Sequence, residues 1–362
     1  MSHSATNITE RICSSAADER VAPALVAAEN SLPSIVSLFC GAGGLDWGFH
    51  SEGFQIPLAI DISTAAIRTH KRNFPCTHSL SADLIKLKPG GVSALAREIV
   101  KPKSRIGIIG GPPCQGFSRA NVNSQADDPR NKLPQLYLEI VEKLQEDYTV
   151  DFVVFENVLG IRDKKHITTY KALINGLETL GFDVTEKELC ALDYGVPQSR
   201  RRIVLSAMRR NQGYGEVRPE KQDGPKTVRQ VIGLLPEPQF FKKNLRPENI
   251  PVHVNHWTMQ PKSPRFSNPD GQYPDGRSFK RLTWEGPSRT IAFGHREIHI
   301  HPDGRRRLSI YEAMLLQGFP ENFVLKGNLS EQVEQVSNAV PPPLARCIAA
   351  AVKRAMQVDR KI

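Results

Sequence analysis

The sequence predicts an α/β fold whose sheet is mostly parallel and doubly wound. Three observations lead to this expectation. Short apolar and β-branched runs alternate with segments of helical periodicity between residues 34 and 209. Glycine, proline or acidic residues directly follow several of these runs. The chain has 362 residues, which is enough for such a domain and a smaller second one.

The expected elements follow one another as strand and helix. Each strand is short and apolar, and each helix repeats its apolar residues every three or four positions. We expect strands at 34–39, 56–61, 105–109, 151–157, 182–191 and 201–209. We expect helices at 45–53, 63–74, 92–100, 134–145 and 168–181, the second of them with a Ser or Thr cap.

The composition changes after residue 209. Residues 210–290 are rich in Pro, Gly, Asn, Lys and Arg without strong periodicity, which is typical of a loop-rich domain. Order returns at 307–320, and a helix is expected at 341–358. We therefore divide the chain into an N-terminal arm (1–33), a first domain (34–209), a loop-rich domain (210–290) and a return to the first domain with a C-terminal helix (291–362).

Net charge and cysteine content indicate the kind of partner and the cellular compartment to expect. Lys and Arg number 48 against 38 Asp and Glu, a net charge of +10, which favours a polyanionic partner such as nucleic acid without proving one. No apolar run is long enough to cross a membrane, and the N-terminus lacks a secretory core. The six cysteines form no CxxC pair, so we expect a reduced, cytoplasmic protein without a zinc cluster.

A glycine-rich turn follows the first strand, in FCGAGGLDWGF (39–49). Such a turn lets the backbone approach a ligand, and Asp61 ends the next strand about where an acidic residue binds ribose hydroxyls. The spacing is neither a Walker loop nor the GxGxxG fingerprint. Together the two features indicate a nucleoside cofactor. The structural alternatives are a tight turn for the glycines and a helix cap for Asp61.

The segment GGPPCQGFS (110–118) stops a strand and presents one thiol. Two prolines stiffen the turn and glycines leave space around Cys114, as a nucleophile requires. For Cys40, Cys76, Cys190 and Cys347 we expect small buried side chains instead.

Two further segments carry charge at strand ends. Glu156, in FENV, ends a hydrophobic strand, so its pKa should be raised by burial, although a helix cap or an ordinary ion pair is an alternative. In QSRRR (198–202), Arg200 and Arg202 should share one face of a strand while Arg201 points to the other. A solvated basic strand end remains the alternative for the arginines.

Three histidines cluster in HREIHIHPDGRRR (295–307), namely His295, His299 and His301. No cysteine or organised acidic partner accompanies them, so we expect surface or DNA-facing side chains and no metal site.

Six blocks occur in a fixed order: FCGAGGLDWGF, GGPPCQGFS, ENV, QSRRR, RRLSIYEAMLLQGFP and VSNAVPPPLA. This set resembles the DNA (cytosine-5-)-methyltransferases of bacterial modification systems, from about residue 35 to 355, with a gap near 210–280. The resemblance implies a Rossmann-like S-adenosylmethionine-dependent fold, in which 34–209 is the catalytic and cofactor-binding domain and 210–290 is the target-recognition domain.

The resemblance also implies roles for individual residues. Cys114 would be the nucleophile, Glu156 would hold the cytosine, Arg202 would contact its carbonyl, and Arg200 would support the site. S-adenosylmethionine would lie against Phe39, Gly41, Gly43, Leu45, Asp61, Ile62, Asp83, Leu84, Pro112, Asn338 and Ala339. DNA contacts are expected from Ser118, Arg119 and Arg130, in a lid over the DNA, and from Gln198. The family more often has Glu in place of Asp61, and usually Gly where this chain has Ser337.

These features imply methylation of C5 of a flipped-out cytosine in a specific double-stranded DNA sequence, through a covalent adduct between Cys114 and C6. The expected partners are DNA and a separately acting restriction endonuclease. We expect a monomer in a bacterial cytoplasm, at the nucleoid when acting, with no membrane partner.

Three alternatives stand beside this interpretation. RNA methylation uses the same chemistry, but the tRNA-acting relatives usually carry a Cys-Phe-Thr signature, and residues 210–290 contain no cysteine. A non-catalytic DNA-binding relative would have damaged PPC or ENV blocks. A dinucleotide oxidoreductase is suggested by the glycine turn alone.

Overall fold

The computed structural model describes residues 32–113, 132–270, 280–290 and 299–357. Residues Pro33–Ile362 form one compact unit. The predicted arm falls almost wholly outside the described residues, and so do Cys114, Ser118, Arg119, Arg130 and His295. The division of the compact unit into smaller domains therefore stays a prediction.

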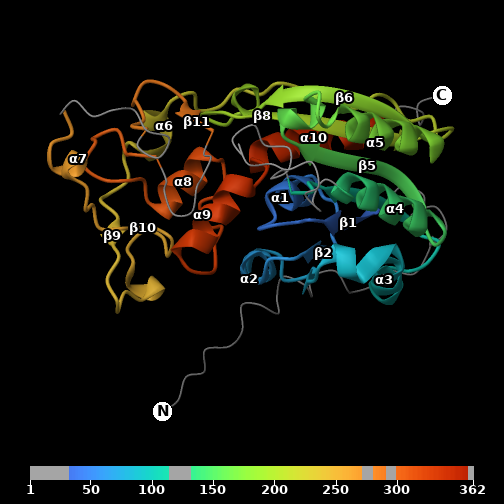
Figure 1. The fold of residues 1–362 in the computed structure, drawn as a ribbon, viewed down its shortest axis with the longest axis horizontal. Coiled ribbons are helices and arrows are strands. Elements are labelled where there is room, and N and C mark those ends of the chain that lie inside the picture. Colours follow the sequence, from blue (N-terminus) through green and yellow to red (C-terminus); the bar gives the residue numbers. More distant parts are fainter. Residues whose placement is uncertain (1–31, 114–131, 271–279, 291–298, 358–362) are drawn as a thin grey trace, which may run out of the picture. The chain divides into compact units, whose positions relative to one another are not determined.

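One large sheet organises the described residues, with seven strands in the order β3-β2-β1-β4-β5-β8-β6 (Figure 1). Neighbouring strands are parallel except that β8 runs antiparallel to both β5 and β6. The predicted α/β fold with a mostly parallel sheet is confirmed. The strands are β1 (Ser34–Leu38), β2 (Leu58–Asp61), β3 (His78–Ser81), β4 (Arg105–Gly110), β5 (Thr149–Asn157), β6 (Phe182–Cys190) and β8 (Arg201–Arg209).

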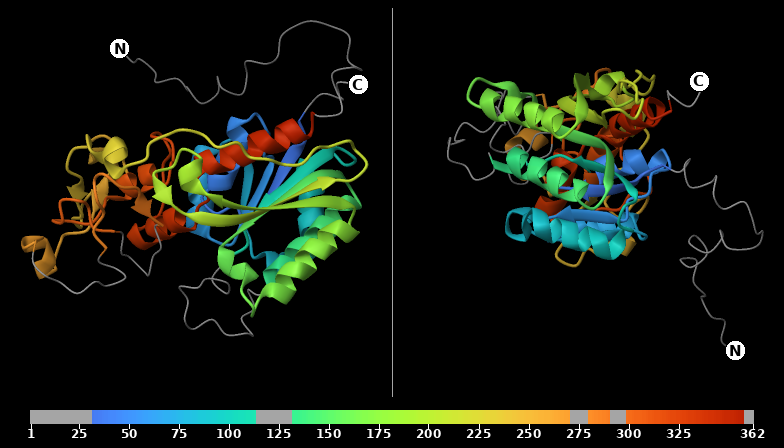
Figure 2. Two further views of the ribbon diagram at one scale, coloured as in Figure 1. Left: turned by 90° about the horizontal axis from the view of Figure 1, so that it is seen from above. Right: turned by 90° about the vertical axis from the view of Figure 1, so that its right-hand side faces the viewer.

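Helices cover both faces of this sheet (Figure 2). One face carries α1 (Gly44–Ser51), α2 (Thr64–Asn73) and α10 (Pro342–Ala355), and the other carries α3 (Leu84–Ile99), α4 (Leu133–Gln145) and α5 (Ile167–Thr179). The α1–α10 contact depends on Gly48, because a Cβ there would lie 2.3 Å from the carbonyl carbon of Ala345. Ser63 caps α2 by accepting from the N–H of Ala66, as the sequence predicted.

The later residues form short elements with a second apolar core, at the left of Figure 1. This region contains short helices besides the loops and short strands that were expected for residues 210–290. Its core also includes Ala42 and Phe74, so it packs directly against the glycine turn and α2. The elements are β7 (Gln198–Ser199), α6 (Val228–Ile232), β9 (Gln239–Phe240), β10 (Trp257–Thr258), α7 (Pro264–Ser267), β11 (Ser288–Arg289), α8 (Ile310–Leu316) and α9 (Leu329–Asn338), with 3-10 turns at Leu159–Arg162, Ala191–Asp193 and Pro247–Asn249.

Three elements differ from the prediction. The strand β3 was missed because it is short and mostly polar at the edge of the sheet. The helix α3 begins at Leu84, but Lys88 breaks its geometry with φ 60° and ψ 166° immediately before Pro89, so only its second half had a helical pattern. The helix α9 was missed because its buried face includes Gln332 and Gln335.

Some side chains also lie elsewhere than expected. Cys76 is exposed rather than buried, because it follows the end of α2 at the surface. His299 and His301 are buried rather than exposed, since they belong to the hairpin that pairs Ile300 with Arg307, and the ring of His301 packs against Trp284. Among the described residues, no helix combines the length and the apolar character needed to cross a membrane.

Candidate active site

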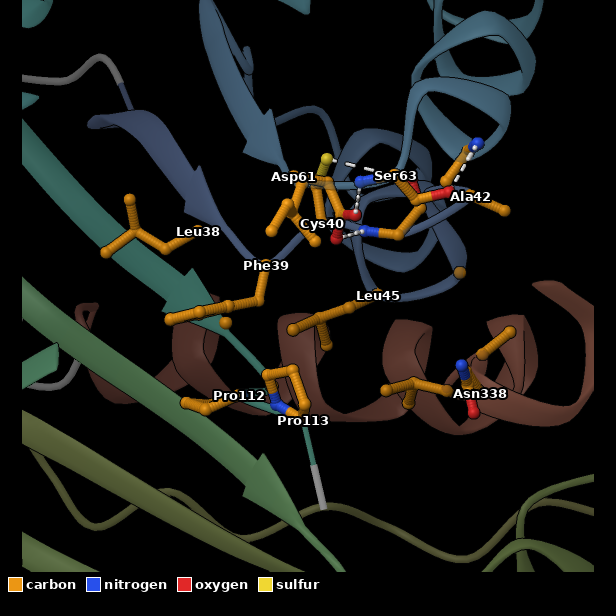
Figure 3. Close-up of a pocket in the computed structure, with 18 of the residues that line it drawn as sticks. Leu38, Phe39, Cys40, Ala42, Leu45, Asp61, Ser63, Pro112, Pro113 and Asn338 are labelled. Carbon is orange, nitrogen blue, oxygen red and sulfur yellow. Dashed lines mark hydrogen bonds between the residues drawn. The ribbon is translucent and has the colours of Figure 1, made fainter. Parts of the chain in front are cut away.

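A cavity of about 410 Å³ opens where the parallel strands end (Figure 3). Its walls come from the turn after β1, the ends of β2 and β4, the start of α3, the end of β5 and the α9–α10 junction. The sequence analysis predicted that the glycine turn, Asp61, the PPC turn and Glu156 would meet at one edge of the sheet. The described part of that set does so.

The turn after β1 has an unusual backbone. Phe39, a residue with a side chain, has φ 53°, and Gly41 and Gly43 have φ 55° and 94°. Positive φ is costly for residues other than glycine and is concentrated at functional sites. The space beyond Gly41 is open, because a Cβ there would meet nothing within 4 Å.

Asp61 holds this turn in place. One carboxylate oxygen accepts from the N–H of Gly41 at 2.9 Å, and the other accepts from the N–H of Ser63 at 2.8 Å, as Figure 3 shows. Burial raises the pKa of Asp61, and the two N–H groups oppose that rise. Asp61 therefore joins the glycine turn to Ser63, the residue that caps α2, while the cap itself is Ser63 and not Asp61 as the alternative supposed. The ligand contact of Asp61 stays a prediction.

All the predicted cofactor residues line the cavity except Gly43. A Cβ on Gly43 would lie 2.4 Å from the ring of Phe74, so this glycine faces α2 and serves the turn instead. Asp83 lines the cavity while capping α3 through the N–H of Ile85. Ile62 and Ile85 are apolar yet 64% and 49% exposed, and both lie on the cavity wall. They add exposed apolar surface to a wall that also contains Phe39 and Leu45.

The last wall comes from the far end of the sequence. Gly44 permits this approach, because a Cβ there would lie 2.3 Å from the carbonyl oxygen of Val340. The amide of Gln317 donates to the carbonyl of Ala339 at 2.7 Å, which holds the α9–α10 junction beside the turn. Asn338 lies on the opposite side of the cavity from Asp61 in Figure 3.

Glu156 occupies the end of β5 at the same cavity. It is only 7% exposed, and its Oε1 lies 2.8 Å from Nε of Arg202. The pair is an ion pair without hydrogen-bond alignment. Burial raises the pKa of the Glu156 carboxyl, while Arg202 and then Arg200 act in the opposite direction. The predicted rise in pKa by burial is confirmed, together with an ion pair that sequence reasoning offered only as an alternative.

The three arginines divide as the alternation predicted. Arg200 and Arg202 line the cavity, whereas Arg201 is exposed and pairs with Glu188 at 2.9 Å. Arg200 is buried, and its Nη2 donates to the carbonyl of Ser337 at 2.8 Å. It thus joins the segment between β7 and β8 to the end of α9.

Gln198 does not lie where the DNA-contact prediction requires. Its side chain is fully buried, and its amide donates to Gln317 Oε1 at 2.7 Å. Gln317 in turn holds Ala339, so Gln198 belongs to a buried chain of amides that supports the cavity wall. The other predicted DNA contacts, Ser118, Arg119 and Arg130, and the predicted nucleophile Cys114 lie outside the described residues.

One group of metal-binding residue types lies beneath the glycine turn. The ligand atoms of Cys40, Asp46 and His70 are all within 4.8 Å of one another. Both ring nitrogens of His70 are already hydrogen-bonded, to Asp46 at 2.8 Å and to Ser79 at 2.7 Å. Burial raises the pKa of the Cys40 thiol, which opposes the thiolate that a metal would need. These contacts favour a structural hydrogen-bond network.

Several wall residues escaped sequence reasoning. The α9 side chains Glu331 and Glu334 line the cavity, and their helix could have been found from the capping box of Asn328 and Glu331. Asn157, the central residue of ENV, is buried and donates to the carbonyl of Pro112. No periodicity could have found this contact, because it joins two strand ends.

Comparison with known proteins gives one consistent result. The family model of C-5 cytosine-specific DNA methylases matches residues 34–354. The Type II methyltransferase M1.HphI of Haemophilus parahaemolyticus is 35% identical over 334 residues, which cover 88% of this chain and 86% of that protein. The Type II methyltransferase M.MthTI of Methanothermobacter thermautotrophicus is 32% identical over 349 residues, covering 89% and 98%. The crystal structure of a putative DNA modification methyltransferase encoded within a prophage (E. coli) has a TM-score of 0.73 at 25% identity, covering 90% of this chain and 100% of that one.

Proposed function

Because this chain belongs to the C-5 cytosine-specific DNA methylases and is a DNA (cytosine-5-)-methyltransferase, we propose that it methylates C5 of a flipped-out cytosine within one specific double-stranded sequence. The observation that carries the proposal is the buried Glu156–Arg202 pair at the mouth of the cavity, beside the turn that leads to Cys114. Here the polar edge of a pyrimidine could be held against a proton donor and a cation.

The cavity fits the methyl donor that the family uses, S-adenosylmethionine. Its volume of about 410 Å³ is in the range for a nucleoside-sized ligand. The exposed side chains of Ile62 and Ile85 offer apolar contact to an adenine ring, and Asp83 would meet its amino group. Asp61 retains free lone pairs for the ribose, since a carboxylate accepts about four hydrogen bonds. When bound, the cofactor supplies an electrophilic methyl group.

Glu156 and Arg202 would act on opposite sides of the cytosine ring edge. The carboxyl of Glu156 would protonate or hydrogen-bond N3, where charge develops during the reaction, and burial raises its pKa in the direction that favours this role. Arg202 would contact the carbonyl of the base. Together they would withdraw electron density from the ring and favour attack at C6.

Cys114 would supply that attack. Its thiolate forms a bond to C6, which makes C5 nucleophilic enough to take the methyl group. A base then removes the C5 proton, the S–C6 bond breaks, and the thiolate is released. The cytosine must leave the stack to reach the thiol, at a cost of roughly a few kcal/mol.

The relatives indicate the biological setting. Those compared above are Type II methyltransferases, so we propose that this chain is the modification enzyme of a restriction-modification system. A restriction endonuclease of the same specificity would act separately. The net charge of +10 suits a DNA partner in the cytoplasm. One active site and one recognition region, here assigned to residues 210–290, would suffice for a monomer.

Bisulfite sequencing of DNA from cells expressing this chain tests the proposal. Cytosines protected within one short recurring motif are expected, and none with Cys114→Ser. Purified Cys114→Ser should still bind S-adenosylmethionine, because serine has nearly the size of cysteine and the substitution removes the nucleophile alone. Protected cytosines in the Cys114→Ser cells would refute the covalent mechanism. A wild-type chain that binds the cofactor yet protects no cytosine would point to RNA as the substrate.

A further inference from the structure

The backbone hydrogen bonds between β4 and β5 end before Cys114, and a side-chain hydrogen bond from Asn157 follows them. The two strands pair in parallel as far as Gly110 and Phe155. Beyond that point come Pro112 and Pro113, which have no N–H to donate to a neighbouring strand. The ladder therefore cannot fix the path of the chain just before Cys114.

The side chain of Asn157 makes two hydrogen bonds just beyond the last paired residues of β4 and β5. Its Nδ2 donates to the carbonyl of Pro112 at 3.2 Å, and its Oδ1 accepts from the N–H of Val158 at 2.9 Å. Asn157 is 1% exposed, so water does not compete for these bonds. A primary amide of this length offers a donor and an acceptor at once. An aspartate would lose the donor, and an alanine would lose both groups.

Gly111 completes the arrangement on the side of the catalytic acid. A Cβ at this position would lie 3.0 Å from Oε2 of Glu156. Two contacts therefore hold the turn against the end of β5. The carbonyl of Pro112 accepts from Asn157, and Gly111 lies close to Glu156. The same short stretch of β5 therefore carries the acid and holds the turn.

We propose that Asn157 is a positioning residue that fixes the direction in which the chain leaves β4 toward Cys114, and thereby the alignment of nucleophile and acid. This inference rests on the proposed function. Asn157 would touch neither cytosine nor cofactor. It acts through the carbonyl of Pro112, so its loss should slow bond formation at C6 and leave the cofactor affinity almost unchanged.

The test compares Asn157→Asp and Asn157→Ala with Asn73→Asp and Asn73→Ala. Asn73 is a matched control, since its Nδ2 donates to the carbonyl of Val324 at 2.9 Å and its Oδ1 accepts from the N–H of Val324 at 3.0 Å. It lies at the end of α2 and does not line the cavity. Aspartate removes the same donor at both positions, and alanine excludes an effect of added charge.

The main readout is the single-turnover rate of covalent trapping on duplex DNA that carries 5-fluorocytosine in the target motif. The assay includes S-adenosylmethionine. After methyl transfer, C5 carries fluorine in place of the proton that a base would remove, so the S–C6 bond cannot break and the adduct persists. Trapping therefore reports attack at C6 and methyl transfer together. Both Asn157 variants should trap DNA about 10- to 100-fold more slowly than wild type, as expected for a displacement near 1 Å. Their dissociation constants for S-adenosylmethionine should stay within about threefold, a range small enough to leave the cavity contacts intact.

The controls separate positioning from stability. The Asn73 variants should melt earlier than wild type but trap DNA at the wild-type rate. Wild-type trapping rates in Asn157→Ala would overturn the inference, even if Asn157→Asp were slow, because added charge would then be the cause. Equal slowing in the Asn73 variants would also overturn it. A wild-type chain that never traps DNA would instead contradict the proposed function.

Discussion

Replacing Gly111 by alanine tests how closely Glu156, the proposed catalytic acid, is packed. The new Cβ would lie 3.0 Å from Oε2 of Glu156, so the carboxyl group has to move by a few tenths of an ångström. It cannot move freely, because its other oxygen lies 2.8 Å from Nε of Arg202. The backbone at Gly111 does not have a positive φ, so the expected effect comes from crowding and not from backbone strain.

The magnitude follows from the geometry. Overpacking by one methyl group costs about 1–3 kcal/mol, and this mild overlap should fall near 1 kcal/mol. A misplacement of about 1 Å costs about 100-fold in rate, so roughly half that displacement should cost about tenfold. We therefore expect Gly111→Ala to lose about tenfold in methyl-transfer rate and to melt about 1–2 °C earlier.

Gly90→Ala is the matched control, because a Cβ there meets nothing within 4 Å and the residue does not line the cavity. Initial rates of labelled methyl transfer to duplex DNA, with thermal melting of the same samples, give both quantities. Gly90→Ala should keep the wild-type rate. If Gly111→Ala also kept it while Glu156→Gln was impaired, the close packing inferred at Gly111 would be refuted.

Three other substitutions follow from the same contacts. Burial raises the pKa of the Glu156 carboxyl, so the contribution of this group to folding stability is fully present below its pKa in the unfolded chain and is lost as the pH rises through its pKa in the folded chain. Glu156→Gln should therefore melt above wild type at pH 8, lose that gain below about pH 4, and transfer methyl groups slowly. Equal melting temperatures at pH 8 would contradict this. Arg200→Met removes the donor to the Ser337 carbonyl and should raise the cofactor KM in steady-state assays, whereas an unchanged KM would mean that the α9 wall holds without it. Gln317→Leu leaves the Ala339 carbonyl without its donor, at a cost of about 1–3 kcal/mol by urea unfolding, and a loss below 0.5 kcal/mol would show that the wall relaxes.

The fold was predictable where local pattern and burial agree. The buried strands β1, β4 and β5 are continuous apolar runs, and the expected ranges differ from the observed ones by only a few residues. The missed strand β3 has little apolar content because it lies at the sheet edge. It buries Ser79 fully and Leu80 only in part. Apolar residues therefore predict a strand only where that strand packs against a hydrophobic core.

The candidate site was predictable to the extent that its residues end strands. Asp61, Pro112 and Glu156 all follow or end parallel strands, so the direction of the sheet brings them to one edge. Gln198 was assigned to DNA because of its neighbours in sequence. Its actual partner, Gln317, is 119 positions away in the sequence, so this contact could not be predicted from local sequence patterns.

The cavity is assembled from both ends of the described chain, and this has a consequence for how ligand and stability are linked. Thr69 on α2 donates to Gln335 on α9 at 2.5 Å, and Arg200 reaches Ser337 at the end of the same helix. Because α9 contributes wall side chains and is held by contacts from α2 and from Arg200, a ligand that fills the cavity binds the assembled form. Such a ligand stabilises that form by about 2.7 kcal/mol at 100 times its dissociation constant. The methyl donor should therefore stabilise the assembled site as well as supply its chemistry.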